Sequence, residues 1–108
     1  MAELENNAVE LRIETSQDHG TEPTIALSGE LDSSNAERLE TAVSALLAER
    51  PRRVVFDLSQ LRFMDSAGIS VLVRLAGQVE TVQIRDPSPI VRRVIEITGL
   101  AGVLQVET

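Results

Sequence analysis

The stretch that decides the fold is VVFDLSQLRFMDSAGI, residues 54–69. Its first five residues are almost continuously apolar, which is typical of a strand buried in an α/β sheet. From Ser66 onward the apolar spacing becomes that of a helix. We therefore predict a strand over 54–58, a short loop across the sheet edge, and a helix that begins at Ser66. Ligands of open α/β sheets bind beside such strand ends, so Ser66 lies where a functional site is expected.

On both sides of this stretch, apolar spacing predicts the remaining elements. Alternation over 9–14 and an apolar run over 24–31 predict an antiparallel hairpin, with a loose turn at Thr15–Glu22 between them. Strands are also predicted over 79–84 and 103–106. The predicted apolar faces of the three helices comprise Ala36, Leu39, Val43, Leu46 and Leu47 in the first, Ile69, Leu72, Val73 and Ala76 in the second, and Ile90, Val94, Ile95 and Ile97 in the third.

The resulting order, β-β-α-β-α-β-α-β, predicts a single α/β domain. Right-handed crossovers then give a mixed sheet of about four to five strands with the three helices mainly on one face. Oxygen-bearing side chains at 32–35 are expected to cap the first helix, and Pro51 lies beyond its end. Ser88 is expected to cap the third helix, with Pro89 at its first position and Gly99 as its stop.

Composition excludes several classes of function. The chain has 108 residues, no cysteine and one histidine, His19, which lies in a polar turn and is interpreted as a solvated loop residue. Disulfides, thiol nucleophiles and a histidine-rich metal site are therefore excluded, and Ser/His/Asp catalysis is disfavoured. With neither a signal peptide nor a membrane-length apolar run, we expect one cytoplasmic domain over 1–108, without membrane insertion and without a cofactor.

Net charge and residue content exclude further classes of partner and function. The formal net charge is −7, and the chain has no tryptophan or tyrosine and only two phenylalanines, so direct binding to nucleic acid is excluded. Asp57 at the end of a buried strand resembles the phosphoaspartate of a response-regulator receiver. Receivers also need a lysine, and this chain has none. We therefore interpret Asp57 as a strand-end residue that accepts hydrogen bonds from loop N–H groups.

Ser66 has two compatible interpretations. As an N-cap, its hydroxyl would accept a hydrogen bond from a backbone N–H two or three residues later, at about 1 kcal/mol. As a phosphoacceptor, it would carry about 1.5–2 negative charges at a helix N-terminus, where the dipole and free N–H groups favour an anion.

Motifs in three places together resemble one family. GELD at 29–32, FMDSAG at 63–68, and PSPIVRRV at 87–94 followed by TGL at 98–100 resemble the STAS domain of bacterial anti-sigma factor antagonists, over a core of about residues 9–106. The resemblance implies that an anti-sigma factor that is itself a serine kinase phosphorylates Ser66. The unphosphorylated chain would bind this kinase and release a sigma factor, phosphorylation would break the complex, and a phosphatase would reset it.

The resemblance also implies a partner-binding site composed of Asp32, Met64, Asp65, Ser66, Ala67 and Gly68. Asp32 would lie near the phosphoacceptor, although it is equally interpreted as the N-cap of the first helix. Asp65 would either position the Ser66 hydroxyl or fix the loop. Negative charge gathered beside these carboxylates on phosphorylation would favour release. Phe63 is expected to pack under the loop. Met64 is expected either to pack there as well or to contact the partner.

Two positions depart from the family pattern. Only Gly77-Gln78 separates the second helix from the next strand, where the family usually has a longer helix, so partner choice could differ. Ala67 replaces a frequent hydroxyl residue and leaves Ser66 as the sole acceptor. The Arg92-Arg93 pair is interpreted as solvated surface paired with nearby acids.

The same fold is compatible with two other functions. STAS domains also act as cytosolic docking or regulatory subunits of lipid or anion transporters, in which Ser66 need not be modified, and as scaffolds in larger stress-signalling complexes. Enzymatic activity is not expected, because Asp57 and Asp65 are separated by a loop and no second polarised group accompanies them. An acidic domain without a long apolar patch is expected to be a monomer when free.

Overall fold

The computed structural model describes residues 10–18, 22–102 and 104–107. Its elements are β1 (Arg12–Asp18), β2 (Glu22–Leu31), α1 (Ala36–Leu47), β3 (Arg53–Met64), α2 (Ser66–Ala76), β4 (Thr81–Arg85), α3 (Pro89–Ile97), the 3-10 turn η2 (Leu100–Gly102) and β5 (Gln105–Glu107). The predicted order of strands and helices is confirmed. No helix among the described residues is long and apolar enough to cross a membrane.

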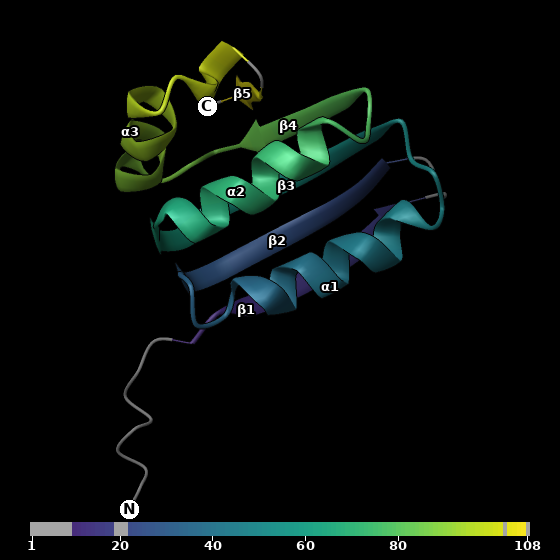
Figure 1. Ribbon diagram of the computed structural model, residues 1–108, viewed down its shortest axis with the longest axis horizontal. Helices are drawn as coiled ribbons and strands as arrows, with labels where there is room; N and C mark the ends of the chain where they lie inside the picture. Colours follow the sequence, from purple (N-terminus) through teal and green to yellow (C-terminus); the bar gives the residue numbers. More distant parts are fainter. Residues whose placement is uncertain (1–9, 19–21, 103, 108) are drawn as a thin grey trace, which may run out of the picture.

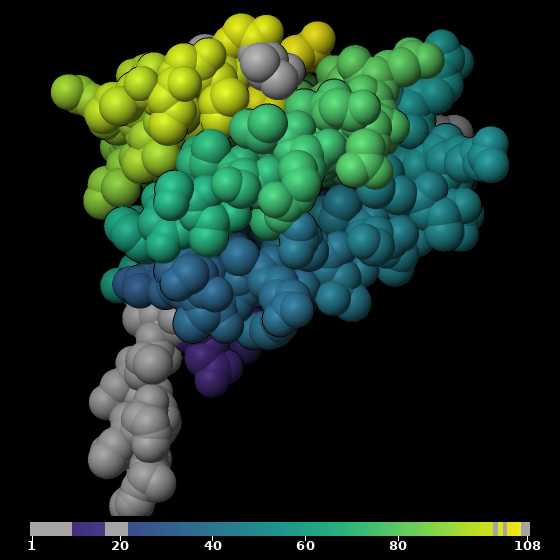
Figure 2. All heavy atoms as spheres, viewed as in Figure 1, coloured from purple at the N-terminus to yellow at the C-terminus, as the bar shows by residue number. Residues whose placement is uncertain are grey.

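The five strands form one mixed sheet in the order β1-β2-β3-β4-β5. β1 is antiparallel to β2, and the other neighbouring pairs are parallel. Each parallel crossover moves one strand further in the same direction, so right-handed connections place α1, α2 and α3 on the same face of the sheet. Figure 1 shows α1 and α2 in front of the sheet, and Figure 2 shows the three helical regions adjoining on this face.

The hairpin is longer than predicted. Thr15 to Asp18, expected in a loose turn, continue β1 and pair with β2 as far as Glu22. Hydrogen bonding along the ladder overrides the polar composition that suggested a turn. Val9, His19 and Val103 lie outside the described residues.

β3 is the largest difference from the sequence prediction. It extends to Met64 through the segment 59–63 that was expected to be a loop. Its register against β2 shifts by one residue between Asp57 and Gln60 and again between Leu61 and Phe63, so β3 contains two β-bulges. Each bulge adds one residue and reverses the phase of alternation. Leu58, Leu61 and Met64 are consequently buried at every third position.

The core lies between the sheet and the helices. α1 buries Leu39 and Val43 as predicted. α2 buries Gly68, Val71, Leu72 and Leu75, whereas Val73, expected inside, is 40% exposed. α3 buries Val91 and Ile95, whereas Ile90 and Ile97, also expected inside, are 59% and 71% exposed. The apolar arc of each helix is wider than the part that the sheet covers, so apolar spacing could not select the buried residues within it.

Candidate functional site

The candidate site lies where β2 and β3 end side by side. The two strands are parallel, and their last residues, Leu31 and Met64, are register partners. The Asp65 N–H donates to the Leu31 carbonyl at 3.2 Å, and this hydrogen bond holds the C-terminal ends of β2 and β3 together. Asp32 and Asp65 therefore begin neighbouring connections at one edge of the sheet, as expected for ligand sites of open α/β folds.

Asp65, not Ser66, is the N-cap of α2. Asp65 has extended backbone angles, and its carboxylate accepts a hydrogen bond from the Ala67 N–H at 2.9 Å. Its carbonyl oxygen accepts from the N–H groups of Gly68 and Ile69. The interpretation of Ser66 as the cap is wrong because the carboxylate one residue earlier already holds that position.

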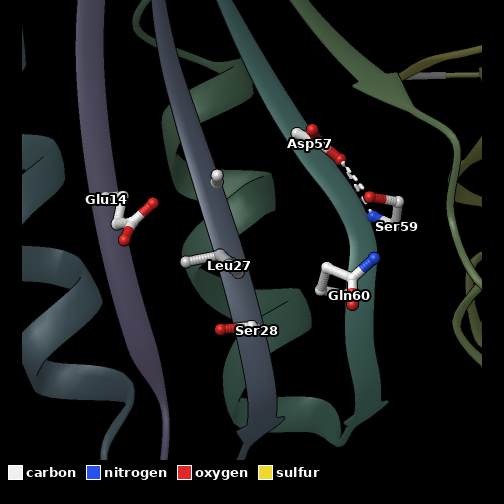
Figure 3. A pocket seen from close by; sticks show the side chains of 7 residues that line it. Glu14, Leu27, Ser28, Asp57, Ser59 and Gln60 are labelled. Carbon is white, nitrogen blue, oxygen red and sulfur yellow. Dashed lines mark hydrogen bonds between the residues drawn. The ribbon is translucent and has the colours of Figure 1, made fainter.

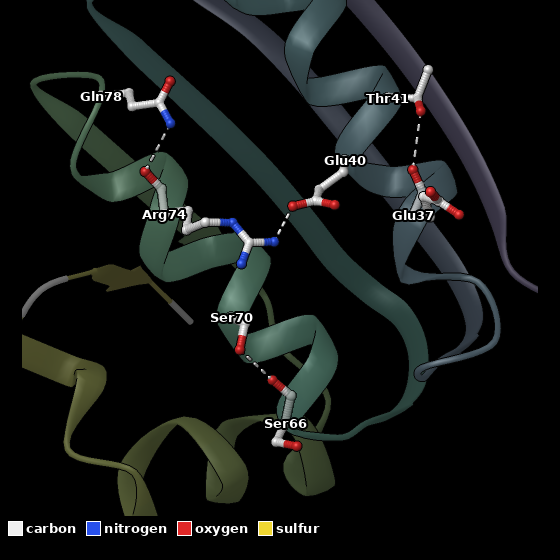
Figure 4. A network of polar contacts seen from close by, with 7 residues as sticks. All are labelled: Glu37, Glu40, Thr41, Ser66, Ser70, Arg74 and Gln78. Atoms are coloured by element: carbon white, nitrogen blue, oxygen red, sulfur yellow. Dashed lines mark hydrogen bonds and ion pairs between the residues drawn. The ribbon is translucent and has the colours of Figure 1, made fainter.

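Ser66 is thus the first residue of α2, and it is exposed. Its carbonyl oxygen accepts a hydrogen bond from the Ser70 hydroxyl at 3.0 Å, while its own hydroxyl makes no hydrogen bond to any residue that the structure describes. Figure 4 shows Ser66 at the N-terminal end of α2, with Ser70 and Arg74 following along the same helix and Gln78 just beyond its C-terminal end. The Ser66 hydroxyl is therefore accessible from solvent without breaking a cap.

Gly68 lets α2 approach the ends of the two strands. A Cβ placed there would lie 2.6 Å from Leu31 Cδ2 and 2.7 Å from Met64 Cγ, which is too close for any side chain without a shift. Met64 is itself 1% exposed. The Met64 side chain therefore cannot contact a partner as expected. It packs against Gly68 at the start of α2 instead.

Asp32 is held in a tight turn rather than at the cap of α1. Its carboxylate accepts hydrogen bonds from the Ser34 hydroxyl at 2.6 Å and the Ser34 N–H at 2.9 Å. These bonds stabilise the charged form and lower the pKa of Asp32 below its ordinary value, and partial burial opposes them only weakly. Asn35 occupies the N-cap position of α1. The lowered pKa favours the anionic form of Asp32, which follows β2 at the same sheet edge where Asp65 follows β3.

Phe63 is the site residue that sequence reasoning misplaced. It is 41% exposed, although it was expected to pack under a loop. Without the second bulge of β3, Phe63 would follow Leu61 into the core and Met64 would point outward. Phe63 lines a hollow with Glu30, Arg62, Ser88, Pro89 and Ile90. The uneven spacing of apolar residues after Leu58 is the only sequence signal of this exchange.

Ser88 positions the start of α3 beside this hollow. It occupies the predicted N-cap position, with Pro89 at the first position of the helix, yet its hydroxyl does not cap the helix. Instead the hydroxyl donates to the Leu61 carbonyl at 2.7 Å, which ties α3 to the bulged part of β3. Gly99 follows the helix with a φ of 78°, as predicted for its stop.

Asp57 lies apart from this site. It is in the middle of β3, not at the strand end, and its carboxylate accepts from the N–H and hydroxyl of Ser59. Figure 3 shows this pair beside a small hollow that Glu14 and Ser28 also line. Asp57 and Asp65 are thus not brought together. Among the described residues, no cluster of acidic or histidine side chains could hold a metal ion.

The remaining predicted features lie outside the candidate site. Gly77-Gln78 follows the C-terminal end of α2, at the opposite end of that helix from Ser66. Arg92 is half-buried and Arg93 exposed, and neither forms an ion pair with an acid in the described part of the chain.

Comparisons with known proteins agree with this geometry. The family model described as "Mlab, STAS domain" matches residues 14–106. BtrV of Bordetella bronchiseptica is 38% identical over 74% of this chain and 72% of its own length. RsfB of Mycobacterium tuberculosis, an anti-sigma-F factor antagonist, is 30% identical over 80% of this chain and 73% of its own length.

A solved structure of an anti-sigma factor antagonist from Mycobacterium paratuberculosis superimposes with a TM-score of 0.83 at 27% identity, covering 90% of this chain and 85% of that one. The chain is therefore a STAS domain. Within that class, it belongs to the family of bacterial anti-sigma factor antagonists.

Proposed function

We propose that this chain is a partner-switching anti-sigma factor antagonist controlled at Ser66. In its unphosphorylated form it binds an anti-sigma factor that is a serine kinase, and a sigma factor is released. Phosphorylation of Ser66 ends this binding, and a phosphatase restores it. The chain itself catalyses no reaction and acts in the cytoplasm.

The observation that carries the proposal is that Asp65, and not Ser66, caps α2. Asp65 caps α2, so the exposed Ser66 hydroxyl is available as a phosphoacceptor without loss of the helix start. A phosphate on the first helical residue lies where the helix dipole favours an anion, so the modified domain stays folded.

The charges nearby supply a reason for release. Asp32 and Asp65 begin adjacent connections at the same edge of the sheet, and the pKa of Asp32 is lowered. A phosphate adds about 1.5–2 negative charges beside these two carboxylates. A partner surface that is complementary to the unmodified site is then repelled by the phosphate or leaves the phosphate without a counter-charge. The complex therefore dissociates.

The test compares Ser66→Ala and Ser66→Asp, with Ser70→Ala as the matched control one turn along the same helix. Each serine-kinase anti-sigma factor of the source organism is purified, incubated with ATP and each variant, and followed by intact-mass spectrometry and calorimetry. We expect phosphate on wild type and Ser70→Ala but not on Ser66→Ala. Ser66→Ala should bind persistently and Ser66→Asp weakly.

Equal affinity of Ser66→Ala and Ser66→Asp for the kinase would contradict the switch. An unmodified Ser66 in cells under several growth conditions, with a transporter subunit bound instead, would support the docking-subunit function of other STAS domains.

A further inference from the structure

We propose that a mixed apolar and basic surface beside the Ser66 site docks an acidic, apolar segment of the anti-sigma factor. This surface, called here the Phe63–Ile90 surface, consists of Arg62, Phe63, Pro89, Ile90, Arg92 and Arg93. The inference rests on the proposed function, because it names the chemistry by which the same partner would be recognised.

Two large apolar side chains from distant segments meet on this surface. Phe63 is 41% exposed and Ile90 is 59% exposed, and both line one hollow at the junction of β3 and α3. Single exposed apolar residues are common, but side chains of this size from two elements around one hollow are typical of an interaction surface. The apolar part therefore offers an anchor point for a partner side chain.

The fold holds this surface in place. The second bulge of β3 turns Phe63 outward, and the hydrogen bond from Ser88 to the Leu61 carbonyl fixes the start of α3 next to it. Phe63 precedes Ser66 by three residues, so their Cα atoms are at most about 11 Å apart. A partner bound at Ser66 therefore needs to extend only a short distance to contact Phe63.

Charge indicates the occupant. Arg62 borders the hollow, and Arg92 and Arg93 border an adjoining one that shares Pro89 and Ile90. None of the three arginines forms an ion pair with an acid among the residues described here. Only Glu30 and Glu96 among the lining residues are acidic, so the surface is basic in a chain whose net charge is −7.

An acidic segment with an apolar side chain complements this arrangement. A second copy of the chain is less well suited, because a two-fold interface on this surface would bring the same arginines together. Electrostatic complementarity of this kind also predicts binding that weakens as salt is added.

The experiment measures affinity for the purified anti-sigma factor that phosphorylates the wild-type chain. The variants are Phe63→Ser, Ile90→Asp and Arg62→Glu, and the control is Ile97→Asp, which changes a residue 71% exposed two turns further along α3. We expect at least a tenfold loss of affinity for the first three and less than a twofold change for the control. Thermal unfolding of each variant shows whether it is folded.

The outcomes separate this inference from the proposed function. If Ser66→Asp weakens binding but Phe63→Ser and Ile90→Asp bind like wild type, the surface proposal is wrong and the switch stands. If no anti-sigma factor binds wild type, both are wrong. Arg62→Glu should also flatten the salt dependence, and an unchanged dependence counts against an acidic occupant. A wild-type dimer that Ile90→Asp dissociates would assign the surface to a second copy instead.

Discussion

At the scale of single residues, the adjacent Asp65 and Ser66 have different roles: Asp65 caps α2, and Ser66 is the proposed phosphoacceptor. The Asp65 carboxylate binds the Ala67 N–H, while the Ser66 hydroxyl is exposed. Stability and signalling are therefore carried by neighbouring side chains, and substitutions can separate them.

We expect Asp65→Ala to lower the free energy of unfolding by about 1 kcal/mol, because α2 loses its N-cap. Asp65→Ser keeps an acceptor at the cap and should recover most of that loss. Ser66→Ala should stay within about 0.5 kcal/mol of wild type, since it removes no cap. Urea unfolding measures all three, and a larger loss for Ser66→Ala than for Asp65→Ala would show that the cap is misassigned.

Asp32 makes a pH-dependent contribution. Hydrogen bonds from Ser34 lower the pKa of Asp32 in the folded chain, whereas the unfolded value is about 3.9. The stabilisation is therefore present above about pH 4 and is lost as pH falls through the lower folded pKa. We expect Ser34→Ala to raise the pKa of Asp32 toward its ordinary value, measured by carboxyl-carbon NMR titration. No movement of that pKa would exclude the Ser34 hydroxyl as a cause, because the variant keeps the backbone N–H bond.

At the scale of elements, the close approach of α2 to the ends of β2 and β3 depends on Gly68. Leu31 and Met64 fill the space where a Cβ would be. The same approach brings Asp32, Asp65 and Ser66 to one edge of the sheet. The FMDSAG motif is thus a packing requirement as well as a signalling one.

We expect Gly68→Ala to destabilise the chain by about 1–3 kcal/mol through overpacking. Gly77→Ala is the matched control, because Gly77 has helical backbone angles and an added Cβ would have ordinary contact distances. It should be neutral or stabilising by about 0.4–1 kcal/mol. Chemical denaturation distinguishes the two, and equal stability of both variants would remove the packing role of Gly68.

At the scale of the whole molecule, consecutive strand order and right-handed crossovers leave one face of the sheet without helices. The central strands β2 and β3 are paired on both sides, whereas β5 has three residues and a single neighbour. The site is thus built on the best-supported strands, and α3 is tied to β3 by Ser88.

Hydrogen exchange should reflect this organisation. We expect the amides of β2 and of Val54 to Leu58 to exchange slowest, close to the rate of global unfolding, and those of β5 to exchange fastest among the strands. Exchange followed by mass spectrometry of peptides tests this. Protection of β5 equal to that of β3 would show that the sheet opens as one unit.

The sequence alone determined the order of the elements, several helix ends and the family of this protein. The order of elements, the helix stop at Gly99 and the place of Ser66 at a helix start follow from apolar spacing, glycine conformation and side-chain chemistry, all of which act locally. The resemblance through residues 63–68 also predicted the family that the comparisons confirm.

The tertiary structure decided what local patterns leave undetermined. The two bulges of β3 exist only against β2; the first buries Leu61 in place of Gln60, and the second restores the alternation so that Met64 is buried and Phe63 exposed. The buried faces of α2 and α3 depend on what packs beneath them, and the cap of α2 depends on which of two adjacent oxygens reaches the helix N–H groups. The bulges and the buried faces are set by contacts between segments distant in the chain, and no periodicity within one segment encodes them; the cap is a local contact at the point where the Asp65 N–H donates to the Leu31 carbonyl.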